Sequence, residues 1–129
     1  MTWEEVVVIG LELPEVEEST SYGRPALKVR GKFFAGLNTK EGAVVLKLAN
    51  VEEQGFLVEA ASKVYYITDH YRGWPYVLAR PARLTKKECR TRLEYAWRLT
   101  APKTLVKRFD EPASAESGKG EKKPGRARR

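Results

Sequence analysis

The feature that most constrains the fold is a run of three short apolar segments separated by two turn signals. The segments are residues 26–30, 33–38 and 43–48. The first alternates apolar and basic side chains, which is the pattern of a strand with one buried face. Gly31-Lys32 and the stretch 39–42 supply the turns between them. Such short links cannot hold a crossover connection, so the run predicts an antiparallel meander.

Helix-start signals lie before, between and after the strand segments. Two are capping boxes. In each, a threonine side chain accepts a hydrogen bond from the backbone amide of the glutamate three residues later, and the glutamate side chain accepts one from the backbone amide of the threonine. The third is an asparagine N-cap. The signals stand at Thr2 and Glu5, at Asn50, and at Thr85 and Glu88. Pro14 ends the first helix because the residue before a proline is pushed out of the helical region. Pro102 breaks the last long helix before one or two further helical turns.

Two more β-prone segments, residues 64–68 and 75–80, follow the second helix. Residues 16–22 are polar and rich in Ser and Thr, and we expect an irregular segment or an edge strand there. The element order is then α-β(3)-α-β(2)-α. It predicts a compact single-domain α+β fold over residues 1–110, with helices against a mostly antiparallel sheet. Residues 111–129 contain no large apolar side chain, so we expect a disordered basic tail.

The charge distribution favours a polyanionic partner. The net charge is +7, yet residues 1–20 hold six glutamates and no Lys or Arg. The rest of the chain is therefore strongly basic, and a small positive excess remains when the tail is set aside. This pattern is typical of proteins that bind nucleic acid. A basic tail combined with ordinary solvated lysines is the alternative explanation.

Several other classes of function lack their sequence signals. The chain has one cysteine, Cys89, and one histidine, His70, so it has no internal disulfide and no multi-cysteine metal site. It shows no nucleophile elbow, no phosphate loop and no secretory leader. The longest apolar run is far too short to cross a membrane. We therefore expect a cytoplasmic, non-enzymatic protein without cofactor, metal or membrane partner. An enzymatic role for His70 beside a Ser or Thr hydroxyl is the weaker alternative.

The run His70-Tyr71-Arg72-Gly73-Trp74-Pro75-Tyr76 is the densest group of binding side chains in the sequence. Stacking of a base on an aromatic face is worth roughly 1–3 kcal/mol, and arginine can contact phosphate or guanine through two bonds. Basic side chains of the strand segments are expected to share one polar face, if the register pairs Lys28 and Arg30 with Lys47. The expected nucleic-acid-binding residues are Lys28, Arg30, Lys32, His70, Tyr71, Arg72, Trp74, Arg80 and Lys103. The alternatives are an ordinary wet sheet face and a Trp74 that seals the core.

Three segments carry a resemblance to a known family. They are Ser-Thr-Ser-Tyr-Gly-Arg-Pro-Ala-Leu-Lys-Val-Arg-Gly-Lys-Phe-Phe-Ala at 19–35, the run at 70–77, and Trp-Arg-Leu-Thr-Ala-Pro-Lys at 97–103. The chain resembles the MmcQ/YjbR-like family. The resemblance implies a compact α+β fold similar to secretion chaperones, and DNA binding through a double wing. The wings would be the hairpin around Gly31 and the loop around Gly73. It implies no catalytic residues. A protein- or peptide-binding module, like a secretion chaperone, is the alternative function.

Overall fold

The structure is a computed structural model that describes residues 1–111. Its helices are α1 (Trp3–Gly10), α2 (Val51–Ala60), α3 (Lys86–Thr100) and α4 (Lys103–Asp110). Its strands are β1 (Val16–Ser21), β2 (Arg24–Val29), β3 (Lys32–Asn38), β4 (Ala43–Lys47), β5 (Tyr65–Tyr66) and β6 (Tyr76–Ala79). Two single 3₁₀ turns, η1 (Asp69–Tyr71) and η2 (Pro81–Arg83), flank β6. The α+β class is confirmed, whereas the expected tail lies outside the described residues except for Glu111.

The described strands form one antiparallel sheet in the order β1-β2-β3-β4-β6-β5. The polar segment that sequence left open is the edge strand β1, so the first run has four strands rather than three. Two tight turns join β1 to β2 and β2 to β3. Their central residues all have positive φ: 52° and 79° at Tyr22 and Gly23, and 51° and 79° at Arg30 and Gly31. Two such residues in succession make a type I′ turn, whose twist matches that of paired strands.

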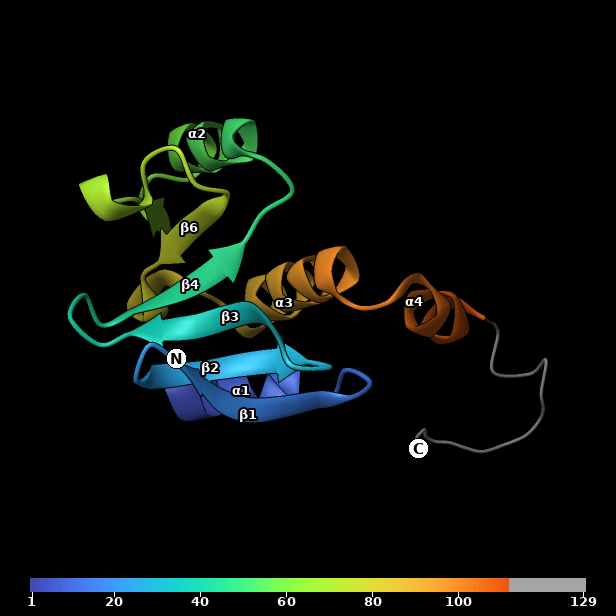
Figure 1. Cartoon of the computed structure of the whole chain (residues 1–129). Helices are drawn as coiled ribbons and strands as arrows, with labels where there is room; N and C mark the ends of the chain where they lie inside the picture. Colours follow the sequence, from blue (N-terminus) through green and yellow to red (C-terminus); the bar gives the residue numbers. More distant parts are fainter. Residues whose placement is uncertain (112–129) are drawn as a thin grey trace.

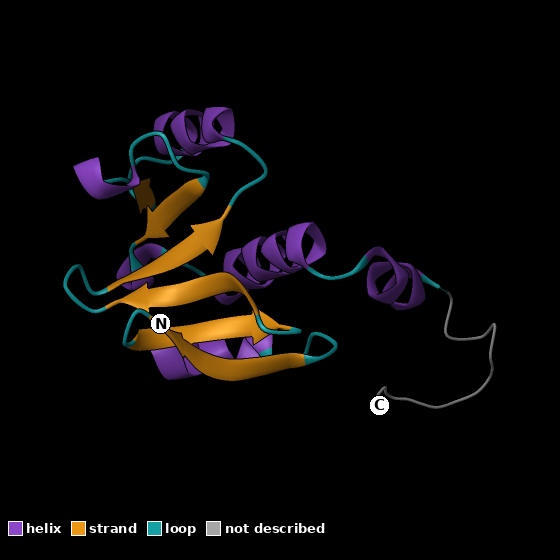
Figure 2. Ribbon diagram, in the orientation of Figure 1, coloured by secondary structure: helices purple, strands orange, loops and turns teal. Residues whose placement is uncertain are grey.

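Helices cover only one face of the main sheet. In Figure 1, α1 and α3 lie behind β1–β4, while no helix lies in front of these strands. Figure 2, in the same orientation, shows α1 and α3 behind the strands, with α2 above the sheet and α4 to its right. The covered face holds the large apolar core, which includes Leu27, Phe34, Leu46 and the fully buried Trp97. The opposite face, which we call the open face, is therefore free to carry a binding site.

Three tertiary contacts fix the C-terminal part of the described chain. The indole N–H of Trp97 donates to the carbonyl of Pro14, 3.0 Å away, and so ties α3 to the segment after α1. Asp110 accepts two hydrogen bonds from Arg98, and the Phe109 ring packs edge-on against Trp97 with centroids 4.9 Å apart. These contacts fold α4 back against α3. Among residues 1–111, the helices fall short of the length and hydrophobicity that a membrane crossing requires.

Candidate binding cleft

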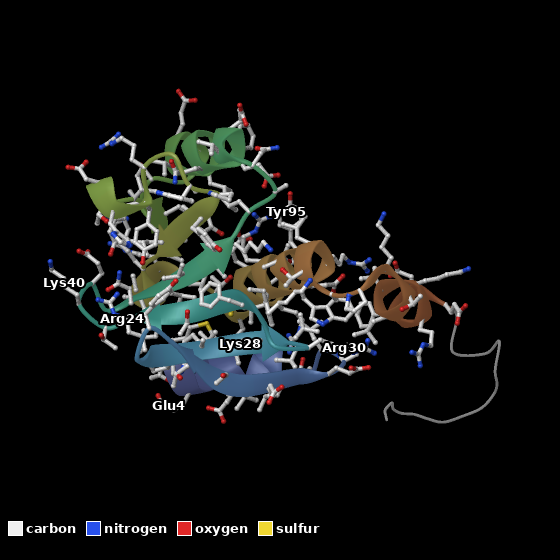
Figure 3. All side chains as sticks on the ribbon, in the orientation of Figure 1. Glu4, Arg24, Lys28, Arg30, Lys40 and Tyr95 are labelled. Carbon is white, nitrogen blue, oxygen red and sulfur yellow. The ribbon has the colours of Figure 1, made fainter. Side chains whose placement is uncertain are left out.

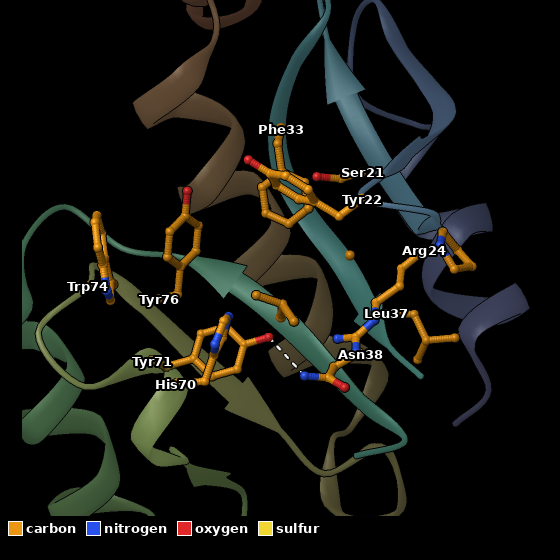
Figure 4. Close-up of a pocket in the computed structure, with 13 residues that line it drawn as sticks. Ser21, Tyr22, Arg24, Phe33, Leu37, Asn38, His70, Tyr71, Trp74 and Tyr76 are labelled. Atoms are coloured by element: carbon orange, nitrogen blue, oxygen red, sulfur yellow. Dashed lines mark hydrogen bonds between the residues drawn. The ribbon is translucent and has the colours of Figure 1, made fainter. Parts of the chain in front are cut away.

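An aromatic cleft of about 770 Å³ lies on the open face. It is lined by residues of the β1–β2 turn, of β2, β3, β4 and β6, and of the loop before β6 (Figure 4). Five of its side chains are aromatic rings other than imidazole: Tyr22, Phe33, Tyr71, Trp74 and Tyr76. Tyr22 is fully exposed and Trp74 is 62% exposed. The cleft thus offers flat apolar surface to solvent, which is costly unless a partner covers it.

Close packing at one glycine sets the floor of the cleft. A Cβ atom on Gly36 would lie 2.8 Å from the Phe33 ring and 3.1 Å from the carbonyl oxygen of Pro25. Only glycine therefore lets the Phe33 ring lie down over β3. The ring meets Tyr76 edge-on, with centroids 5.9 Å apart. The pair spans the gap between β3 and β6 above β4, because β4 pairs with both strands.

A single amide holds the loop that carries Trp74. Gln54 of α2 is 5% exposed, and its Nε2 lies 2.8 Å from the carbonyl of Tyr71 and 2.9 Å from those of Trp74 and Tyr76. Gly73, with φ of 84°, allows the sharp bend between these carbonyls. The loop is consequently fixed to a helix rather than left to solvent, so the indole is presented in a defined place.

The Tyr71 side chain is held by contacts within the fold. Its hydroxyl accepts a 2.9 Å hydrogen bond from Nδ2 of Asn38 on β3 (Figure 4), and its ring packs on the small open-face cluster around Val45 and Leu78. The exposed His70 ring stands edge-on to Tyr71 with centroids 5.0 Å apart. Tyr71 therefore positions the loop, while Trp74 and His70 remain available to a ligand.

Arg24 is the cation that enters the cleft. It reaches from the start of β2 toward Asn38 in Figure 4, and both residues also line an adjoining polar hollow of about 340 Å³. Arg24 is half-buried, and within residues 1–111 its guanidinium makes neither a hydrogen bond nor an ion pair. Arg24 is not among the residues with a buried unsatisfied nitrogen, so its donors are open to solvent and to a ligand.

Two lysines flank the aromatic floor. Residues that pair across antiparallel strands point to the same face of a sheet. Lys28 pairs with Phe33, and Lys47 pairs with Tyr76, so both lysines lie on the open face. Glu17 pairs with Lys28 from the other side, but neither lysine comes within 4.0 Å of a carboxylate in the described chain. Both ammonium groups therefore remain available to an anion.

All three arginines that we expected at the binding site make contacts with other groups of the protein. Arg30 stands in the β2–β3 turn and forms a two-pronged ion pair with Glu15, at 2.5 and 3.0 Å. Arg72 forms an exposed 2.8 Å ion pair with Asp69. Arg80 donates to the carbonyl of Ser62 and stacks 4.2 Å above the Tyr66 ring. The expectation that Arg30 shares the face of Lys28 and Lys47 is therefore wrong, because the left-handed turn at Arg30 breaks the strand alternation.

The remaining assigned residues divide between the cleft and other surfaces. His70, Tyr71 and Trp74 line the cleft, and Lys28 borders it. Lys32 lies at the β2–β3 hairpin, and Lys103 begins α4. Figure 3 shows Arg24, Lys28 and Arg30 spaced from one end of β2 to beyond the other. The hairpin around Gly31 lies at the right end of the strands in Figure 1, and the loop before β6 lies at the upper left. The strand pairing nevertheless puts both expected wings at the same end of the strands, because β2 ends, β3 begins, β4 ends and β6 begins there, and β4 lies between β3 and β6.

Sequence reasoning missed four cleft features. Arg24, Tyr22 and Phe33 were not among the expected binding residues, although the strand alternation that selects Lys28 also selects Arg24 on the same side. The Tyr22-Gly23 pair is a type I′ signal that would have placed an exposed ring at a turn. Gln54 gave no local signal at all, because its three acceptors lie 17 to 22 residues further along the chain.

The strongly shifted ionisable groups lie away from the cleft. Burial raises the pKa of the Cys89 thiol to about 11, as expected for a buried cysteine rather than an activated one. Burial also raises the pKa of Tyr65, and so does the hydrogen bond that its hydroxyl donates to Glu88. Among the described residues, no three His, Cys, Asp or Glu side chains gather as metal ligands would. The chemistry that the cleft itself offers is stacking, hydrogen bonding and attraction of negative charge.

Fold and cleft together define a small α+β protein whose antiparallel sheet presents an aromatic binding cleft on its uncovered face. The family model described as YjbR matches residues 11–99. The chain therefore belongs to the YjbR family, which confirms the resemblance drawn from the three sequence segments. No curated protein and no solved structure matches the chain.

Proposed function

We propose that this protein binds nucleic acid without catalysing a reaction, and that the open face of the sheet is its binding surface. The observation that carries the proposal is the set of unpaired cations beside exposed aromatic rings. Arg24 lines the cleft, and Lys28 and Lys47 flank it. Phosphates attract such cations, and every base has a π-face that an aromatic ring can stack on.

The proposed contacts carry little sequence information. Lysines act on phosphates as point charges, and stacking tolerates any base. We therefore expect weak sequence preference, with backbone contacts fixing the position of the strand. Three neutralised phosphates give a slope of log K against log salt of about −2 to −3. The affinity then falls about 16- to 64-fold between 50 and 200 mM salt.

The test uses fluorescence anisotropy with the full chain and a labelled DNA oligonucleotide. Replacing Lys28 and Lys47 together by Gln should weaken binding and make the salt slope shallower by about 1.5. The matched control replaces two exposed lysines at the start of α3, Lys86 and Lys87, by Gln, which removes the same charge from another surface. We expect the control to change binding much less.

Two results would overturn the proposal in different ways. No binding at 50 mM salt removes the nucleic acid as partner and leaves the peptide-binding alternative. An equal loss of affinity in both double variants means that the interaction is one of general charge, and the open face is not the site. Circular dichroism of each variant checks that the α+β body stays folded.

A further inference from the structure

We infer that the cleft takes unpaired bases, so that the ligand of this protein is single-stranded or locally unpaired nucleic acid rather than intact duplex. The inference deepens the proposed function and rests on it. Its basis is the aromatic faces of Tyr22 and Trp74, which are open to solvent, and the unpaired guanidinium of Arg24 beside them.

The exposed rings of the cleft favour unpaired bases as ligands. In a duplex the faces of the bases stack on one another, and only their edges reach the grooves. An exposed indole or phenol can therefore stack on a base where that base has left the helix, or where neighbouring base pairs are forced apart. The Trp74 ring has no ring–ring or cation–π partner in residues 1–111. Its face is thus left to a ligand and not used by the fold.

The extent of the cleft also suits a short run of stacked bases. The lining crosses β2, β3, β4 and β6, which are three inter-strand steps. At about 4.8 Å a step this is roughly 14 Å of aromatic surface. Open four-stranded sheets that bind RNA stack two or three bases on such a surface. A flexible single strand can place successive bases on an aromatic surface of this length.

Arg24 supplies a positive charge beside the aromatic rings. Its guanidinium lies where the aromatic cleft joins the polar hollow, so a base on the rings places its phosphate or its edge within reach. Arginine matches either group with two parallel hydrogen bonds. The carboxylates that line the hollow are already engaged: Asp69 pairs with Arg72, and Glu41 accepts from the Tyr66 hydroxyl. Both carboxylates keep their negative charge, and Lys40 is a second cation of the hollow, but Arg24 is the one that also lines the aromatic cleft.

The side chains of the cleft are held in place before a ligand binds. Gln54 ties the Trp74 loop to α2, and the Phe33 ring lies fixed over Gly36. A ligand therefore has few side chains to order when it binds, so more of the stacking energy appears as affinity.

The test compares a 12-nucleotide single strand with the 12-base-pair duplex of the same sequence, using the full chain at 50 mM salt. We expect the single strand to bind at least tenfold more tightly. Trp74→Leu should weaken single-strand binding about 5- to 150-fold, as expected for a loss of 1–3 kcal/mol of stacking, and leave duplex binding unchanged. Tyr22→Ala and Arg24→Gln should act in the same direction.

Phe56→Leu is the matched control, because Phe56 is an aromatic residue of α2 that is 70% exposed and does not line the cleft. It should leave both affinities unchanged. Duplex binding as tight as single-strand binding, with Trp74→Leu harmless, would overturn the inference and leave the proposed function standing. Absence of binding to either form would overturn both.

Discussion

The most informative single perturbation is the replacement of the buried amide that holds the aromatic loop, Gln54→Leu. The Gln54 Nε2 group lies within 2.9 Å of three carbonyls, but it has only two N–H bonds to give. Leucine is as good a helix former as glutamine and fills a similar volume, so the loss is mainly that of hydrogen bonds.

The loss of stability in Gln54→Leu depends on which hydrogen bonds the three carbonyls keep. The carbonyls of Tyr71 and Trp74 also accept from the amides of Trp74 and Tyr76, at 3.0 and 2.8 Å. They are therefore not left wholly unsatisfied. Two lost hydrogen bonds at about 1 kcal/mol each give a destabilisation of about 2 kcal/mol. For a domain of this size, that lowers the melting temperature by roughly 8 °C.

Urea unfolding followed by tryptophan fluorescence measures the stability, and hydrogen exchange measures the loop. The amides of Trp74 and Tyr76 should lose protection more than those of the central strands. Glu59→Leu is the control, because it places the same new side chain at an exposed position of the same helix. A change below about 0.5 kcal/mol with unaltered exchange would refute the view that this amide organises the cleft.

Three further outcomes follow from the structure. Gly36→Ala should displace the Phe33 ring, whose nearest atom lies 2.8 Å from the new Cβ, and weaken nucleic-acid binding more than it lowers stability in a parallel urea titration. Cys89, with its pKa raised to about 11, should react with a thiol reagent at pH 8 roughly 200-fold more slowly in the native protein than in denaturant; comparable rates would contradict its burial. Arg98 lowers the pKa of Asp110, so that carboxylate contributes stability above the unfolded pKa and loses it as the pH falls through the folded one. The stability gap between wild type and Asp110→Asn should be constant near pH 7 and begin to narrow as the pH falls below about 4; the absence of any gap at pH 7 would count against the ion pair.

Local signals were enough to predict most of the fold. The box at Thr2 and Glu5 forms with both of its hydrogen bonds, and Asn50 caps α2 as expected. The second box is only half formed. Thr85 accepts from the amide of Glu88, but the Glu88 carboxylate accepts from the Tyr65 hydroxyl instead of reaching back. A tertiary partner outcompetes the local one, and the sequence around Thr85 carries no sign of it.

The candidate site was harder to predict, because it depends on register. Alternation put Lys28 and Lys47 on one face, as the strand pairing does, although a register shift between Leu27 and Lys28 interrupts the pairing of β2 with β3. It failed at Arg30, where the chain turns into the left-handed region and an ion pair with Glu15 takes the charge. The pairing of residues far apart in the chain decides which cations stay free. Composition alone cannot show this.

The one-sided helix layer also bears on how such a protein can change over evolutionary time. Because α1 and α3 bury the far side of the sheet, the outermost rings at Tyr22 and Trp74 add little to the apolar core. Substitutions of exposed side chains usually cost less than about 0.5 kcal/mol of stability. A lineage can therefore retune what this surface recognises, residue by residue, while the scaffold beneath persists.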